Sequence, residues 1–170
     1  MRKIIECVPN FSEGRDMEII RQITAEIEKV KGVKLLDVDP GATTNRTVVT
    51  FVGEPDDVCE AAFQCVKKAK QLIDMRHHKG DHPRFGATDV CPLVPVADIT
   101  MEEVVVYARK LAERIANELH IPIYCYENAA FEEKRRNLAN CRQGEYEALK
   151  ERIESQEWKP CFGPCKYDEE

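Results

Sequence analysis

The sequence predicts an α/β chain of the α+β class: a two-layer sandwich in which a mixed sheet carries its helices on one face. The length of 170 residues suits one domain of ordinary size. Short apolar runs rich in branched side chains alternate with segments whose apolar residues recur at helical spacing. No internal repeat or low-complexity segment interrupts this alternation, so we expect one continuous core.

The first half of the chain predicts three strands and two helices. Residues 3–9 form an apolar run that we expect to be a buried strand. Isoleucines recur at helical spacing from Ile19, and Gly32 ends that helix. Residues 33–39 and 46–52 predict a second and a third strand, antiparallel to each other. Pro55 opens the second helix at its first position, where a missing N–H costs nothing.

The second half continues the alternation and then weakens. Residues 89–96 predict an edge or irregular strand, because two prolines interrupt it. Thr100 and Glu103 fit a capping box that begins a third helix. Residues 121–126 predict a short last strand, and one more amphipathic helix follows near Tyr146. The order matches a ferredoxin-like βαββαβ core with an extension, and its second sheet face is left for solvent or a partner.

Composition excludes several functions. The net charge of −6 argues against a general nucleic-acid binder. No apolar run approaches the ~20 residues of a membrane span, and the N-terminus lacks the apolar core of a signal peptide, so we expect a cytoplasmic protein. The eight cysteines are then expected to be reduced thiols. Cys161 and Cys165 form a C-x-x-x-C, which alone is a weak zinc signal.

A polar loop at residues 74–84 concentrates groups that could transfer protons. Three of the four histidines lie within six residues of one another, and three cations accompany them: His77, His78 and His82 with Arg76, Lys79 and Arg84. Histidine suits proton transfer near neutral pH, and neighbouring cations favour its neutral form and attract carboxylates. The alternatives are a solvated basic loop or a fortuitous metal site.

Further polar residues flank the loop before the third strand. Asn45 and Arg46 offer an amide and a guanidinium at the strand entry. Asp37 and Asp39 are two residues apart, so they face the same side of the second strand. These carboxylates could reach a site, or they could be solvated acids at a strand end.

Several motifs together identify a resemblance. They are Glu6-Cys7-Val8-Pro9-Asn10-Phe11-Ser12-Glu13-Gly14, Leu36-Asp37-Val38-Asp39, Thr44-Asn45-Arg46-Thr47, Lys79-Gly80-Asp81-His82-Pro83-Arg84, Asp89-Val90-Cys91-Pro92 and Phe162-Gly163-Pro164. With these segments, nearly the whole chain resembles the formimidoyltransferase domain of formimidoyltransferase-cyclodeaminases and glutamate formimidoyltransferases.

The resemblance implies an enzyme of histidine degradation and one-carbon metabolism. Its reaction moves the formimino group of N-formimidoyl-L-glutamate to tetrahydrofolate, which is a co-substrate, and it implies no metal. Folate lies in a groove between two α/β subdomains in that family, and the histidine of a His-Pro-Arg motif is catalytic. That histidine maps onto His82. A folate-contacting segment maps onto Gly163, Pro164 and Cys165.

Other residues follow as candidate contacts. Arg46, Lys79 and Arg84 suit the carboxylates of glutamate and of the folate tail, Asn45 lies beside them, and Asp39 could steady the cationic amidine.

The family's domain is about twice as long as this chain. We therefore expect residues 1–160 to be its N-terminal subdomain and residues 161–170 a truncated, folate-contacting linker. Partners are expected to be folate, the glutamate substrate, and either a second copy of the chain or a complementary second-subdomain chain. The alternatives are a non-catalytic folate-binding or assembly module, and a metal-binding protein that uses the histidine loop with Cys161 and Cys165.

Overall fold

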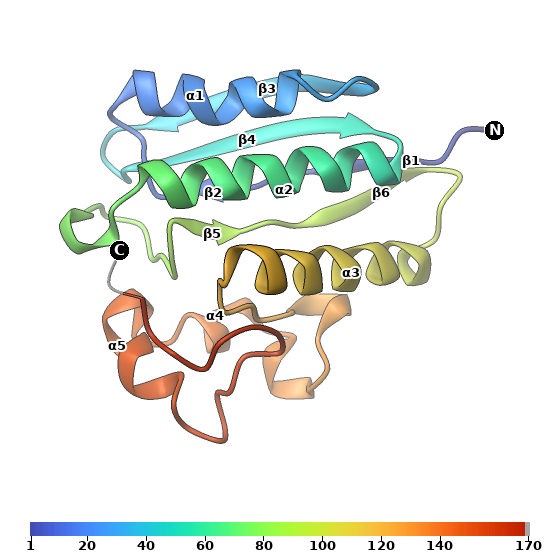
Figure 1. The fold of residues 1–170 in the computed structure, drawn as a ribbon. Helices are drawn as coiled ribbons and strands as arrows, with labels where there is room; N and C mark the ends of the chain where they lie inside the picture. Colours follow the sequence, from blue (N-terminus) through green and yellow to red (C-terminus); the bar gives the residue numbers. More distant parts are fainter. Residues whose placement is uncertain (169–170) are drawn as a thin grey trace.

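The computed structural model describes residues 1–168 as one sheet with helices packed against it (Figure 1). The strands are β1 (Ile4–Cys7), β2 (Asn10–Phe11), β3 (Val33–Gly41), β4 (Arg46–Gly53), β5 (Thr88–Val90) and β6 (Leu93–Ala97). The helices are α1 (Met17–Glu28), α2 (Pro55–Leu72), α3 (Met101–Leu119), α4 (Leu138–Cys141) and α5 (Glu145–Arg152). Single 3₁₀ turns are η1 (Met75–His77), η2 (Glu127–Ala129) and η3 (Glu133–Arg135).

The sheet is antiparallel, so the predicted mixed sheet is wrong. Its six strands run in the order β5-β2-β4-β1-β6, with β3 also paired to β4, and each described pairing is antiparallel. β3 and β4 form a hairpin, and β1 and β2 both pair with β4. β1 and β2 are separated at Pro9, and β5 and β6 at Pro92, because proline has no N–H for a ladder.

The predicted last strand at residues 121–126 is also wrong. This segment does not join the sheet and makes a single antiparallel bridge, between Ile123 and Phe162 of the tail. Its few apolar residues pack on the core from outside the sheet. They therefore give the segment the apolar pattern of a strand, although it does not pair with the sheet.

Alternation along β4 fixes which sheet face is buried. Val49 and Phe51 are fully buried against α1 and α2, while the residues between them are half-buried on the opposite face. This core is completed by Ile5 of β1, Ile27 of α1 and the buried side chains of α2. Figure 1 shows α1 and α2 lying across the same face of the strands. The other face, which we call the open face, carries Arg46 at the start of β4.

The predicted helix starts at Pro55 and Thr100 are confirmed, whereas α1 ends at Glu28, before the predicted stop at Gly32. Asp16 accepts hydrogen bonds from the first backbone amides of α1, and Pro55 occupies the first turn of α2. Thr100 and Glu103 form the predicted capping box of α3. No described helix is long and apolar enough to cross a membrane.

Residues after α3 form an extension below the sheet edge, coloured orange to red in Figure 1. It encloses an apolar cavity of about 490 Å³ together with α3 and β5. Tail residues pack on this extension: the rings of Tyr146 and Tyr167 lie 5.2 Å apart, and the Tyr146 hydroxyl donates to the carbonyl of Asp168 at 2.5 Å. The last two residues of the predicted linker lie outside the described part of the chain.

The core predicts a large difference between two phenylalanine truncations. We expect Phe51→Ala to lower the free energy of unfolding by about 4 kcal/mol, because it leaves a cavity between the sheet and its helices. Phe131→Ala is the control: that ring is 53% exposed, packs edge-on with Phe162 and lies under the Arg109 guanidinium, so we expect about 1 kcal/mol. Urea denaturation measures both, and equal losses would contradict this account of the core.

Candidate functional site at the end of the open face

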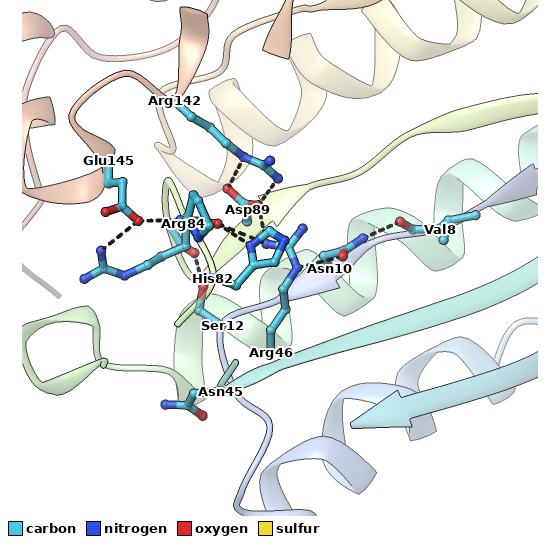
Figure 2. A network of polar contacts seen from close by, with 12 residues as sticks. Val8, Asn10, Ser12, Asn45, Arg46, His82, Arg84, Asp89, Arg142 and Glu145 are labelled. Atoms are coloured by element: carbon cyan, nitrogen blue, oxygen red, sulfur yellow. Dashed lines mark hydrogen bonds and ion pairs between the residues drawn. The ribbon is translucent and has the colours of Figure 1, made fainter. Parts of the chain in front are cut away.

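A buried carboxylate organises the polar end of the open face. Asp89 of β5 is 0% exposed at its side chain and accepts hydrogen bonds from Arg46 and Arg142 at the same oxygen, Oδ2 (Figure 2). Arg142 Nε also donates to Asp89 Oδ1 at 3.2 Å, and Arg46 Nε donates to Asn10 Oδ1 at 2.9 Å. The two guanidiniums are only 10% and 16% exposed. Two cations share one anion, so this group, which we call the arginine pair, keeps one excess positive charge.

His82 lies beside the arginine pair (Figure 2). Its Nδ1 is 2.6 Å from the carbonyl oxygen of Pro83, and a carbonyl only accepts, so Nδ1 carries the proton. The neutral ring then has its lone pair on Nε2. Arg46 Nη1 donates to the same Pro83 oxygen at 3.5 Å. One backbone carbonyl therefore contacts both the imidazole and the guanidinium, and Nε2 is left as the basic atom of the site.

Asn45 holds the histidine loop in place. It is buried with a left-handed φ of 47°, which asparagine tolerates better than most residues. Its Oδ1 accepts from the Gly14 amide at 2.9 Å, and its Nδ2 donates to the Lys79 carbonyl at 3.1 Å. A Cβ on Gly80 would lie 2.1 Å from the Thr44 carbonyl oxygen, so only glycine lets the loop approach this closely. Both polar atoms of the Asn45 side chain are thus used by backbone groups.

Arg84 points into the protein rather than toward solvent. Its Nη1 donates to Glu147 of α5 at 2.9 Å, and its Nε donates to His78 Nδ1 at 3.1 Å. His78 Nε2 lies 2.8 Å from the Asn45 carbonyl, so this buried ring is a neutral tautomer with its proton on Nε2. The Arg84 guanidinium lowers the pKa of Glu147 below its ordinary value through these hydrogen bonds. Arg84 therefore ties the loop to the extension.

The remaining predicted residues lie apart from this group. The side chains of Lys79 and Asp39 are exposed, and Asp39 faces the open side of β3 opposite Val48. Gly163 has a φ of 90°, and a Cβ there would lie 2.6 Å from the Ile121 carbonyl oxygen. Pro164 is half-buried and Cys165 exposed in the same tail. The structure brings Arg46 next to His82, and it anchors the tail on residues 121–123.

Sequence reasoning missed Asp89 and Arg142 as site residues. Asp89 stands in the motif at residues 89–92, which could have identified it. Arg142 lies 53 residues further on in a segment without clear periodicity, so no local pattern indicated it. Within residues 1–168 no group of three or more histidine, cysteine or acidic side chains is placed to hold a metal ion.

The fold and site define an α+β subdomain with a histidine and an arginine pair on an open sheet face. A family model described as the formiminotransferase domain, N-terminal subdomain, matches residues 4–170, and the chain belongs to this family.

Relatives in other organisms agree with this membership. A formimidoyltransferase-cyclodeaminase of Dictyostelium discoideum is 52% identical over 98% of this chain, which spans 31% of that protein. The one of Gallus gallus is 53% identical over 96% of this chain, which spans 30% of it. A glutamate formimidoyltransferase of Streptococcus pyogenes is 48% identical over 98% of this chain, which spans 56% of it. The chain therefore spans between 30% and 56% of the length of these relatives.

The arginine pair predicts a large stability effect at Asp89. We expect Asp89→Asn to lower the free energy of unfolding by about 3 kcal/mol, because two buried guanidiniums would lose their shared anion. The same substitution at exposed Asp37 of β3 is the control, with an expected change below about 0.5 kcal/mol. Urea denaturation at pH 7 compares the two. A similar small loss in both variants would contradict the pairing.

Proposed function

We propose that this chain supplies the histidine-bearing half of a glutamate formimidoyltransferase active site. The proposed reaction transfers the formimino group of N-formimidoyl-L-glutamate to tetrahydrofolate, as in histidine degradation and one-carbon metabolism. One observation carries the proposal: His82 donates through Nδ1 to Pro83, which leaves Nε2 as a base beside the arginine pair. Membership of the formiminotransferase family supports it.

The chemistry needs one group that first takes and then gives a proton. The folate amine attacks the amidine carbon, and a tetrahedral intermediate forms. The attacking nitrogen loses a proton to His82 Nε2. The departing glutamate nitrogen gains that proton as its bond to carbon breaks, and His82 returns to its neutral form. The Pro83 carbonyl keeps the proton on Nδ1 throughout and accepts a stronger hydrogen bond while the ring is charged.

Charge near His82 suits the substrates, which are carboxylates. The excess positive charge of the arginine pair favours binding of an anionic group close to the imidazole. Lys79 is exposed and can reach a ligand, whereas Arg84 is paired with Glu147. We therefore propose Arg46 and Lys79 as the orienting cations. We also propose that Asp39 contacts the amidine. The tail residues Gly163, Pro164 and Cys165 are proposed to contact folate.

A second subdomain is part of the proposal, because the chain spans 56% of a glutamate formimidoyltransferase relative. The second subdomain would cover the open face of the sheet, and a homodimer is part of the same proposal. We propose that residues 1–160 form the N-terminal subdomain and that residues 161–170 belong to the linker. A cytoplasmic location belongs to the same proposal.

The core is proposed to be ferredoxin-like. If β1 with β2, and β5 with β6, are counted as single strands interrupted at Pro9 and Pro92, the chain runs strand, helix, strand, strand, helix, strand. Both β1 and β2 pair with β4, as the two parts of one interrupted strand would, and this supports the proposal.

A histidine comparison tests the proposed base. We expect His82→Ala to lower formation of 5-formimidoyltetrahydrofolate by 10²- to 10⁴-fold, since the proton would lose its carrier. The assay uses the chain mixed with a separately produced second subdomain of a glutamate formimidoyltransferase. His77→Ala is the matched control, because that ring is 83% exposed in the same loop, and it should keep normal activity. Normal activity in a folded His82→Ala variant would remove His82 from its role.

The excess positive charge of the arginine pair would equally serve one other function, a folate-binding or assembly module without turnover. Calorimetry with folinate separates the two. We expect micromolar binding to the chain alone or with the second subdomain, weakened about tenfold by Arg46→Gln because one orienting cation is lost. Binding without turnover when both subdomains are present would favour the module over the enzyme.

A further inference from the structure

A second cluster of polar and nucleophilic groups lies in the extension, outside the histidine site. The sulfur of Cys161 accepts a hydrogen bond from the Cys125 amide at 3.3 Å and one from Arg135 Nη1 at 3.1 Å. Cys161 itself is only half-buried, unlike the fully buried Cys7 and Cys65.

Arg135 is built into this cluster rather than solvated. It is 3% exposed, and its Nη2 donates to the carbonyls of Lys159 and Glu157 at 2.7 Å and 3.2 Å. It also pairs with half-exposed Glu132 at 3.4 Å. Its Nε is buried without a hydrogen-bond partner among the described residues. A buried guanidinium directed at a sulfur stabilises that sulfur as a thiolate.

The other buried thiols have the opposite environment. Desolvation raises the pKa of Cys7 and Cys65, which keeps them protonated and unreactive. At Cys161 the Cys125 thiol, its amide and Arg135 lower the pKa instead, while the Cys125 pKa is raised. The proton of the pair therefore resides on Cys125, and the charge resides on Cys161.

We propose that Cys161 is a peroxide-sensitive modification site whose oxidised sulfur is resolved by Cys125 as an intrachain disulfide. The co-reactant is a hydroperoxide, of which hydrogen peroxide is the simplest. The proposal rests on the contacts of this cluster and is independent of the proposed transferase activity.

The two steps balance with one peroxide. The Cys161 thiolate attacks one peroxide oxygen, the O–O bond breaks, and hydroxide leaves, which gives a sulfenic acid. Hydroxide takes the Cys125 thiol proton to form water. The Cys125 thiolate then attacks the Cys161 sulfur, the S–O bond breaks, and hydroxide leaves and takes a proton from solvent. In total two thiols are oxidised, one peroxide is reduced, and two waters form.

Oxidation would act on the tail that carries Gly163 and Pro164. The Cys161 amide donates to the Ile123 carbonyl at 2.8 Å, and the Ile123 amide donates to the Phe162 carbonyl at 2.9 Å. A disulfide would remove the Cys161 thiolate that faces Arg135. It would also add a covalent bond beside the backbone bridge between Ile123 and Phe162. Cys165, the second cysteine of the C-x-x-x-C motif, is exposed, and the contacts of Cys161 run to Cys125 instead.

Alkylation of the wild-type chain gives the first test. Limited iodoacetamide at pH 6.5 is followed by peptide mass spectrometry. We expect Cys161 to react at least tenfold faster than Cys165, the exposed internal control, because the Arg135 guanidinium and the Cys125 amide stabilise the Cys161 thiolate. Equal rates for the two cysteines would overturn the proposal, and this test needs no variant.

Peroxide treatment gives the second test. Stoichiometric hydrogen peroxide should join Cys125 to Cys161 in the wild-type chain and in Cys165→Ser. Cys125→Ser should instead accumulate a sulfenic acid on Cys161, which dimedone traps, and Cys161→Ser should give neither product. A disulfide between Cys161 and Cys165, or no oxidation at Cys161, would overturn the assignment.

Discussion

The carboxylate of Asp89 is the constraint on which the polar end of the molecule depends. It is fully buried, and a buried carboxylate must be paired or it would not stay ionised. Its two partners come from distant parts of the chain: Arg46 begins β4, and Arg142 follows α4. Pairing therefore holds the extension against the sheet edge. It also fixes Arg46 where it contacts both Asn10 and the Pro83 carbonyl, so the place of His82 follows from the same carboxylate.

Local rules made much of the fold predictable. The capping box of α3, the proline at the start of α2 and the β3–β4 hairpin are decided by residues close in sequence, and each was found where expected. The antiparallel direction of the paired strands was not predicted, because antiparallel and mixed sheets share the same apolar periodicity. The segment 121–126 looked like a strand for the same reason. Pairing partners are a long-range property that a local pattern does not contain.

Predicting the site from sequence had a similar limit. The motif at residues 79–84 singled out His82 with Arg84, and the entry to the third strand added Asn45. A sequence does not tell whether a cation faces a ligand or the protein interior. Arg84 faces inward, because Glu147 and His78 lie on that side, and both side-chain atoms of Asn45 are used by backbone groups. Arg142, which has no motif of its own, completes the arginine pair instead.

These inward-facing groups still bear on the chemistry, because they position the base. Arg84 directly follows Pro83, whose carbonyl accepts the His82 Nδ1 proton, so fixing Arg84 through Glu147 and His78 fixes that acceptor. Asn45 and Gly80 set the other end of the loop. Because Nδ1 of His82 carries the proton, only Nε2 can act as the base. The other tautomer, which has its proton on Nε2, could not accept a proton there. The loop's cations therefore serve partly as positioning residues, and the remaining positive charge near His82 comes from the two guanidiniums that share Asp89.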